Sequence, residues 1–108
     1  MCAIDDFVVL TQSENAQITF CKQCKSFSLA FKSSCASFSA SELDQFRKML
    51  ETLSPVDYNY HMMGEAMAII RNSMSSLGLC LTPDDTQELI GVIRESLTLF
   101  EAFEVIYR

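Results

Sequence analysis

The spacing of apolar residues changes along this chain, and the change constrains its fold more than any other feature. Before Ser39, apolar side chains recur at every second position, as in strands with one buried face; after it they recur at every third or fourth. The same change occurs at Thr82, because Leu77, Leu79 and Leu81 alternate and helical spacing follows. We therefore expect an α+β fold, an antiparallel sheet with two amphipathic helices packed on one face.

The strand predictions rest on short alternating runs that polar turns separate. In the clearest run, Phe27, Leu29 and Phe31 would line the buried face, and the serine and lysine side chains between them would be solvated. The loop 55–60 carries two aromatic residues and is not assigned to a strand. Strands are predicted at residues 6–11, 16–21, 26–32, 35–38 and 66–71, with a further alternating run at 77–81.

Both helices begin with capping signals. Ser39 and Glu42 are spaced as a capping box for the first helix, which should end at the Ser54-Pro55 step. Thr82 caps the second helix, with Pro83 at its first position. This C-terminal helix carries two adjacent apolar stripes, more than one small sheet usually covers. We therefore expect either a buried helix or a homodimer formed through it.

The length of 108 residues fits one domain, 1–108. Aligning Ser39 with Thr82 superposes apolar helix positions, and each helix follows a short apolar strand. This pattern suggests an internal repeat of a strand–strand–helix unit, residues 26–53 and 66–100. Independent convergence on the same helix signals is the alternative reading.

Charge and composition exclude several classes of function. Fourteen acidic and eight scattered basic residues give a net charge of −6, whereas binding to a phosphate backbone needs clustered Lys and Arg. We expect no nucleic-acid partner, and no membrane span either, because no run of 18 apolar residues occurs. The N-terminus lacks the basic region of a secretory signal, and five loosely spaced cysteines do not suggest a disulfide framework. A cytoplasmic location is expected.

The step from Cys21 to Cys24 is the one local arrangement that could carry chemistry. Two thiolates in C-x2-C can bind Zn²⁺ when a turn brings the sulfurs together, although Lys25 replaces the glycine that usually follows such a pair. Lys22 and Lys25 would also favour the thiolates of a redox pair, but the helix N-terminus that usually lowers the thiol pKa is absent. Zinc binding, thiol redox chemistry and no chemical role all remain open.

A closed zinc site needs four ligands. Cys2 is the candidate third ligand, because a hairpin that places Asp6 opposite Cys21 would direct the N-terminus toward the pair. The fourth would have to be His61 or Cys80, and no spacing places either one there. Zinc is therefore an alternative cofactor, with Cys2, Cys21 and Cys24 as its ligands.

No catalytic constellation is apparent. His61 is the only histidine and has no serine or cysteine tied to it by spacing, and the three glycines form no phosphate-binding loop. We expect a non-enzymatic protein-interaction or homodimerisation module with an unknown protein partner. A zinc-binding domain and a thiol redox protein are the alternatives.

Cys21, Cys24, Leu29 and Phe31 form a C-x2-C-x4-L-x-F pattern, and Phe46 follows in the first helix. This pattern resembles a family of short bacterial proteins of unknown function, found mainly in Bacteroidetes. The likeness spans residues 18–53 and, less closely, the second strand–strand–helix unit. The resemblance implies a bacterial cytoplasmic origin and no particular activity.

Overall fold

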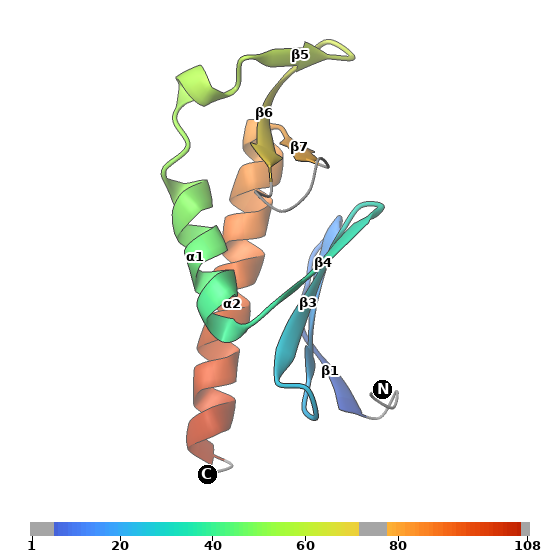
Figure 1. Ribbon diagram of the computed structural model, residues 1–108, viewed down its shortest axis with the longest axis vertical. Coiled ribbons are helices and arrows are strands. Elements are labelled where there is room, and N and C mark those ends of the chain that lie inside the picture. The colour runs from blue at the N-terminus through green and yellow to red at the C-terminus, as the bar shows by residue number, and fades with distance from the viewer. Residues whose placement is uncertain (1–5, 72–77, 107–108) are drawn as a thin grey trace.

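The computed structural model describes residues 6–71 and 78–106 and has an α+β architecture (Figure 1). The predicted fold class is confirmed, but the strands form two antiparallel sheets instead of one. The large sheet has the order β1-β2-β3-β4, and the small sheet has the order β5-β6-β7. The elements are β1 (Phe7–Gln12), β2 (Ala16–Cys21), β3 (Ser26–Phe31), β4 (Ser34–Phe38), α1 (Ala40–Glu51), the 3-10 turn η2 (Pro55–Asp57), β5 (Tyr60–Met62), β6 (Glu65–Arg71), β7 (Gly78–Leu81) and α2 (Pro83–Ile106).

The inner face of the large sheet forms the core. Phe27, Leu29 and Phe31 of β3 are at most 4% exposed, which confirms the predicted buried face. The rings of Phe20 and Phe27 lie 5.0 Å apart, and Phe100 of α2 lies 5.0 and 5.1 Å from them. Aromatic pairs at this separation add to the hydrophobic free energy that the buried area supplies.

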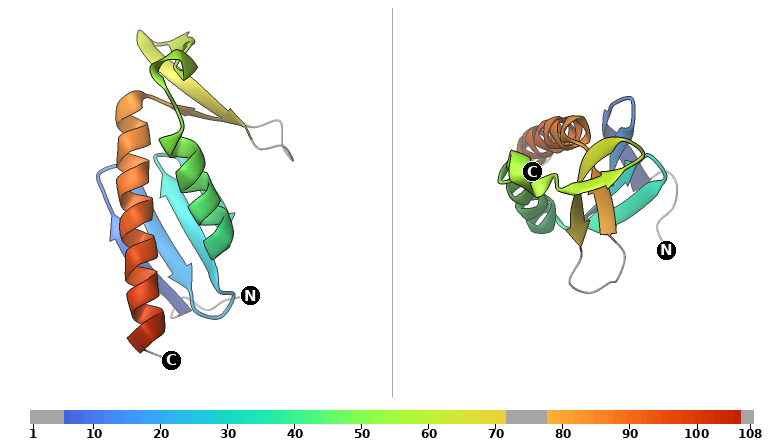
Figure 2. Two further views of the ribbon diagram at one scale, coloured as in Figure 1. Left: turned by 90° about the vertical axis from the view of Figure 1, so that its left-hand side faces the viewer. Right: turned by 90° about the horizontal axis from the view of Figure 1, so that it is seen from above.

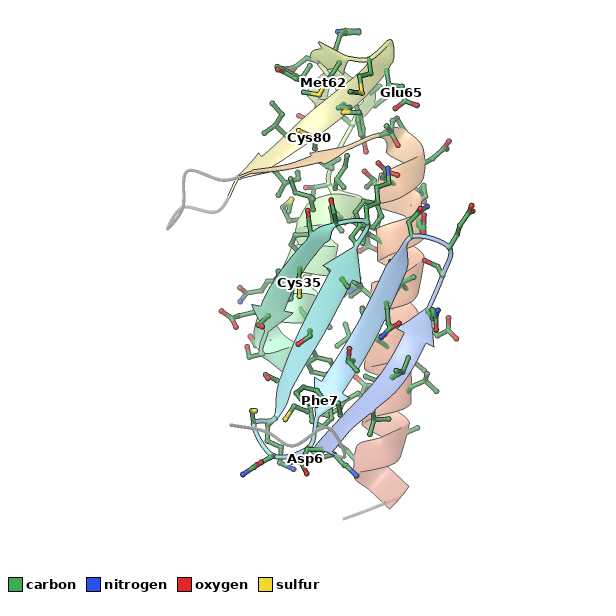
Figure 3. All side chains as sticks on the ribbon, turned by 90° about the vertical axis from the view of Figure 1, so that its right-hand side faces the viewer. Asp6, Phe7, Cys35, Met62, Glu65 and Cys80 are labelled. Atoms are coloured by element: carbon green, nitrogen blue, oxygen red, sulfur yellow. The ribbon has the colours of Figure 1, made fainter. Side chains whose placement is uncertain are left out.

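The outer face of the large sheet carries small polar side chains on β2, β3 and β4, whereas its edge strand β1 exposes Phe7 and Val9 there. Thr19, Ser28 and Ser37 lie side by side across three strands because the register pairs each with the next. Cys35 is exposed on the same face, and Figure 3 shows it above Phe7. The hydroxyl-bearing part of this surface needs no protein cover, because hydroxyl groups can hydrogen-bond to water.

Both helices cover the inner face of the large sheet (Figure 2). Helix α2 contacts β1, β2, α1 and β7, so it joins the two sheets, while α1 lies over β3 and β4. Leu89 and Ile93 are fully buried and Ile90 is 8% exposed, so one face of α2 is buried in the core while Arg94 and Glu95 are exposed on the other. Leu99, 42% exposed, is the large apolar side chain that α2 leaves at the surface among its described residues.

The predicted helix caps are present. The Ser39 hydroxyl accepts the Glu42 N–H at 3.2 Å, and the Glu42 carboxylate accepts the Ser39 N–H at 2.8 Å. Thr82 and Asp85 make the same reciprocal pair, with both bonds at 3.1 Å. The first helix ends at Glu51, slightly before the predicted stop, and the hydroxyl and N–H of the next residue, Thr52, both bond to the last turn of α1.

Two details differ from the sequence-based expectations. Tyr60 begins strand β5, although the run 55–60 was expected to be a loop throughout. Phe7, not Asp6, lies opposite Cys21, because the hairpin turn is centred one residue later than expected, at Glu14-Asn15, and a register shift between Val9 and Thr11 offsets only part of this difference. This bulge inserts one residue into β1 and moves every partner before it by one position.

The segments β3–β4–α1 and β6–β7–α2 share the same order of elements, a hairpin followed by a helix. The internal repeat of residues 26–53 and 66–100 itself stays a prediction, and Leu77 lies outside the described residues. Neither α1 nor α2, as described, is long and apolar enough to cross a membrane.

Candidate functional site

The first candidate site is the turn between β2 and β3, at the end of the large sheet where Figure 3 marks Asp6. Two backbone hydrogen bonds hold this turn. The Lys22 N–H donates to the Asp6 carbonyl at 2.8 Å, and the Lys25 N–H donates to the Cys21 carbonyl at 2.9 Å. The turn is therefore a fixed part of the β-hairpin and positions the side chains of Cys21 and Cys24.

The cysteine sulfurs converge within this turn. The Sγ atoms of Cys21 and Cys24 are 3.1 Å apart, and the Cys24 N–H donates to the Cys21 Sγ at 3.4 Å. Cys21 is 1% exposed, whereas Cys24 is exposed. Lys25 has a φ of 60°, the left-handed conformation that glycine adopts most easily. The chain thus makes the turn of a C-x2-C-Gly sequence without its glycine.

The other predicted ligands that the structure describes, His61 and Cys80, are not brought to this pair. Cys2 lies outside the described residues. His61 and Cys80 belong to the small sheet, at the opposite end of the molecule in Figure 1. Cys35 lies opposite Ala30, four positions along β3 from the partner of Cys21, or about 13 Å at the usual rise of a strand. In the described ranges, no three potential metal ligands come together.

The second candidate site is the outer face of the small sheet. The register pairs Tyr60 with Met67 and Ile69 with Cys80, and strand alternation places Met62 beside Tyr60. Tyr60 is 42% exposed and Met62 is 38% exposed, while Met67, Ile69 and Cys80 are half-buried. We call these five residues the small-sheet face. Figure 3 shows two of them, Met62 and Cys80, above the large sheet.

The opposite face of the small sheet is buried against the core, which leaves the small-sheet face on the outside. Ala68 and Leu81 are paired in register and are 2% and 0% exposed. Ile70 and Leu79 pack against the core on the same side. The small-sheet face was not predicted, because residues 60–62 were not assigned to a strand. The alternation of Tyr60 and Met62 was the available signal, but three residues are too few to show a period.

The hairpin between β5 and β6 ends in a two-residue turn, Met63-Gly64, whose φ angles are 53° and 79°. Two positive φ values define a type I′ turn, in which Asn-Gly is the favoured pair. Methionine has no side-chain hydrogen bond to offset the cost of this conformation. Met63 is nevertheless 93% exposed, so an apolar side chain projects from the tip beside the small-sheet face.

Residues 1–99 match the model of a family of unknown function, DUF6686. The chain belongs to this family. No curated protein and no solved structure matches it. The family match confirms a family of unknown function, while the bacterial source and the C-x2-C-x4-L-x-F motif stay predictions.

This DUF6686 protein also has an open cleft of about 540 Å³ between α1 and α2. Its lining includes Arg47 and Arg94, which would attract an anion if they were unpaired. Arg47 instead bonds to Asp44 at 2.7 Å, and Glu51 accepts from both arginines. These pairs neutralise the arginines, so the cleft is a helix–helix junction with no net pull on a charged ligand.

Charged side chains elsewhere in this DUF6686 protein join its elements. Glu88 of α2 accepts hydrogen bonds from the side chains of Ser13 and Asn15 and from the Asn15 N–H. The Asn15 side chain and then the Ser13 hydroxyl lower the pKa of Glu88 from its ordinary value of 4.5. Lys32 lies 3.4 Å from Asp85 in the same region. These bonds fix the β-turns of the large sheet to α2 and have no evident catalytic role.

Proposed function

We propose that this DUF6686 protein is a non-enzymatic protein-interaction module of the bacterial cytoplasm, and that the small-sheet face is its binding surface. The observation that carries the proposal is the exposure of Tyr60 and Met62 in a row of apolar side chains, with Met63 93% exposed beside them. Contiguous apolar surface on a folded protein is typical of an interface.

The free energy available from covering this face is substantial for its size. Removing apolar surface from water contributes about 25 cal/mol for each Å². Methionine is also well suited to a binding surface because its flexible, polarisable side chain adapts to different partners. Met62, Met63 and Met67 are all on or beside the small-sheet face.

Charge and size argue for a different protein as the partner, not a second copy. The chain has a net charge of −6, so two copies repel each other, whereas a basic protein is attracted. Glu65 is exposed at the rim of the face, where it lies opposite Met62. Five side chains also cover much less than the roughly 800 Å² that each partner of a stable complex usually buries. We therefore expect a transient partner with an apolar patch rimmed by Lys or Arg.

A homodimer through α2 is the competing prediction. It rests on the two apolar stripes of that helix: Leu89, Ile90 and Ile93 of the first stripe are buried in the core, whereas Leu99 of the second is 42% exposed. Sedimentation of the purified protein over a wide concentration range distinguishes the two models. We expect a monomer throughout; a dimer would favour the α2 model and contradict a surface reserved for another protein.

Site-specific photo-crosslinking in cells tests the binding surface. A photoreactive amino acid replaces Met63, and the matched control replaces Ala30, which is exposed on the outer face of the large sheet. We expect discrete cross-linked products from position 63, fewer from position 30, and a loss of the former in a Tyr60→Ser, Met67→Ser background. Equal products from both positions, or only a product of twice the chain mass, would contradict the proposal.

A further inference from the structure

We propose that the free edge of strand β1 is a second interaction surface, which takes an extended, basic segment of another protein as a fifth strand of the large sheet. Three exposed apolar side chains meet at this edge: Phe7 and Val9 of β1 and Leu99 of α2 are 42%, 53% and 42% exposed. Figure 3 shows Phe7 at the opposite end of the molecule from Met62, so this edge is separate from the small-sheet face and does not depend on it.

The backbone of β1 has hydrogen-bonding groups that point away from the sheet. The Asp6 carbonyl accepts the Lys22 N–H at 2.8 Å and therefore faces β2. The Phe7 N–H belongs to the same trans peptide group, so it points to the free edge. Because pairing alternates along an antiparallel ladder, the Phe7 carbonyl and the Val9 N–H point to that edge as well. In the described part of the chain, no strand lies beyond β1.

Helix α2 lies beside this edge. Ser96 faces the sheet and bonds to Thr11 of β1, whereas Leu97 lines the cleft between α2 and α1. Since α2 lies over β1 and β2 and α1 lies over β3 and β4, the flank of α2 that is turned away from α1 follows the free edge. At about 100° per residue, Leu99 and Glu95 fall on that flank. An added strand would therefore lie beside both of them.

These surroundings define the chemistry of the partner segment. Alternate side chains of an added strand would lie next to Phe7 and Val9 on the outer face, and those between them would lie next to Leu99 on the other face. Both sets should be apolar. Glu95 is exposed on the same flank and the chain has a net charge of −6, so Lys or Arg in the segment is attracted. A second copy of this acidic chain is disfavoured for the same reason.

The first half of β1 has none of the usual protection of a free edge. Natural edge strands often carry Lys or Pro, which prevent pairing with another chain, and the strand Phe7–Gln12 contains neither. The bulge between Val9 and Thr11 is another such device, but it interrupts only the second half of the strand. Regular pairing is therefore available before the bulge. So short a ladder fits a weak, reversible complex.

Peptide selection on the purified full chain tests the proposal. The probe is a phage-displayed library of unconstrained peptides, and we expect the enriched sequences to combine alternating apolar residues with Lys or Arg. Fluorescence anisotropy of a labelled selected peptide then gives its Kd. In amide hydrogen exchange followed by NMR, the bound peptide should protect the N–H groups of Phe7 and Val9. The Val8 N–H, which faces β2, should be protected without it.

Two variants and a control place the peptide at the edge. Val9→Pro removes an N–H that the added strand needs and breaks no bond to β2, so it should weaken binding about tenfold and leave the circular dichroism spectrum unchanged. Leu99→Lys leaves β1 intact and should also weaken binding, because it removes an apolar contact and repels a basic segment. Val56→Lys, at a 78% exposed position in the 3-10 turn η2, is the matched control and should have no effect.

N-methylation of the peptide tests the backbone pairing itself. Only every second N–H of an added strand faces β1, so methylating one alternate set should abolish binding and methylating the other should not. A library that yields no enriched peptide, or peptides that bind the original chain and Val9→Pro equally, would overturn the proposal. Peptides that lose binding only in the Tyr60→Ser, Met67→Ser background would also overturn it, while supporting the small-sheet face as the binding surface.

Discussion

The two sheets of this protein differ in where they expose apolar side chains: the large sheet does so at Phe7 and Val9 of its edge strand β1, and the small sheet does so across its outer face. The large sheet buries Phe27 and Leu29 under the helices and turns Ser28 outward, the usual arrangement of an antiparallel sheet with one wet face. The small sheet buries Leu81 on its inner face, yet its outer face is apolar and includes Tyr60. Strand alternation alone therefore does not show which face of a sheet is exposed to solvent. In the small sheet, both faces have the composition of a sheet that is covered on both sides.

If the large sheet supplies most of the core, substitutions on its inner face should destabilise the fold far more than substitutions on the small-sheet face. Phe27→Ala should lower the free energy of unfolding by about 3–5 kcal/mol, because a fully buried ring in contact with Phe20 and Phe100 leaves a cavity. Tyr60→Ala, its control, should cost less than about 1 kcal/mol. Urea unfolding followed by circular dichroism measures both. Equal losses would show that the small sheet is as much a part of the core as the large one.

The contact between the large sheet and α2 should also depend on one buried polar pair. Thr11 and Ser96 are 7% and 0% exposed, and their hydroxyl groups hydrogen-bond to each other. Ser96→Ala should cost about 1–3 kcal/mol because it leaves the Thr11 hydroxyl unpaired. Thr98→Ala, on the exposed side of the same helix, is the matched control. Adding Thr11→Val to Ser96→Ala should recover part of the loss, and no recovery would argue against the unpaired hydroxyl as its cause.

The attachment of the large sheet to α2 should weaken in acid. Because its bonds to Asn15 and Ser13 lower the pKa of Glu88 in the folded state, the unfolded state binds the proton more readily. The carboxylate therefore stabilises the fold above its ordinary pKa of 4.5, and this contribution is lost as pH falls through the lower folded pKa. Glu88→Gln should flatten the acid limb of the stability–pH curve. Glu95→Gln, an exposed change of the same charge, should leave the curve's shape unaltered.

The smallest change in the free energy of unfolding is expected at the tip of the small sheet, where a substitution should stabilise the fold instead of destabilising it. Met63→Asn should stabilise the fold by up to about 1 kcal/mol, because asparagine tolerates the positive φ of a type I′ turn better than methionine. The same substitution should reduce photo-crosslinking from a probe placed at Met62. Thermal unfolding gives the first quantity. A destabilised variant would show that Met63 packs against the chain, contrary to its exposure.

The large sheet and both helices could be predicted from the sequence because their signals are local. The alternation of Phe27, Leu29 and Phe31 and the capping residues Ser39 and Thr82 each fall within one element. The division of the strands into two sheets depends on pairing across distant segments, which no local pattern encodes. The same reason explains the missed small-sheet face.

The candidate cysteine site was only partly predictable. The spacing of Cys21 and Cys24 indicated a metal or redox pair, and the structure shows their sulfurs 3.1 Å apart. The expected position of Asp6 opposite Cys21 was wrong by one residue, because the polar run 11–15 does not show on which residues the hairpin turn is centred. The absence of glycine counted against the turn, yet Lys25 adopts the required backbone conformation, which only tertiary structure could reveal.

The position of α2 across both sheets has a consequence for how the chain is made. The four strands that precede Ser39 can pair soon after they leave the ribosome, but Phe20 and Phe27 stay uncovered until Phe100 arrives. At translation rates of about 5–20 residues per second, the roughly 60 residues between Phe38 and Phe100 take from about 3 to about 12 s to synthesise. For that interval the nascent sheet exposes an aromatic face. A chaperone that binds apolar surfaces would therefore bind the nascent sheet before helix α2 is available to cover it.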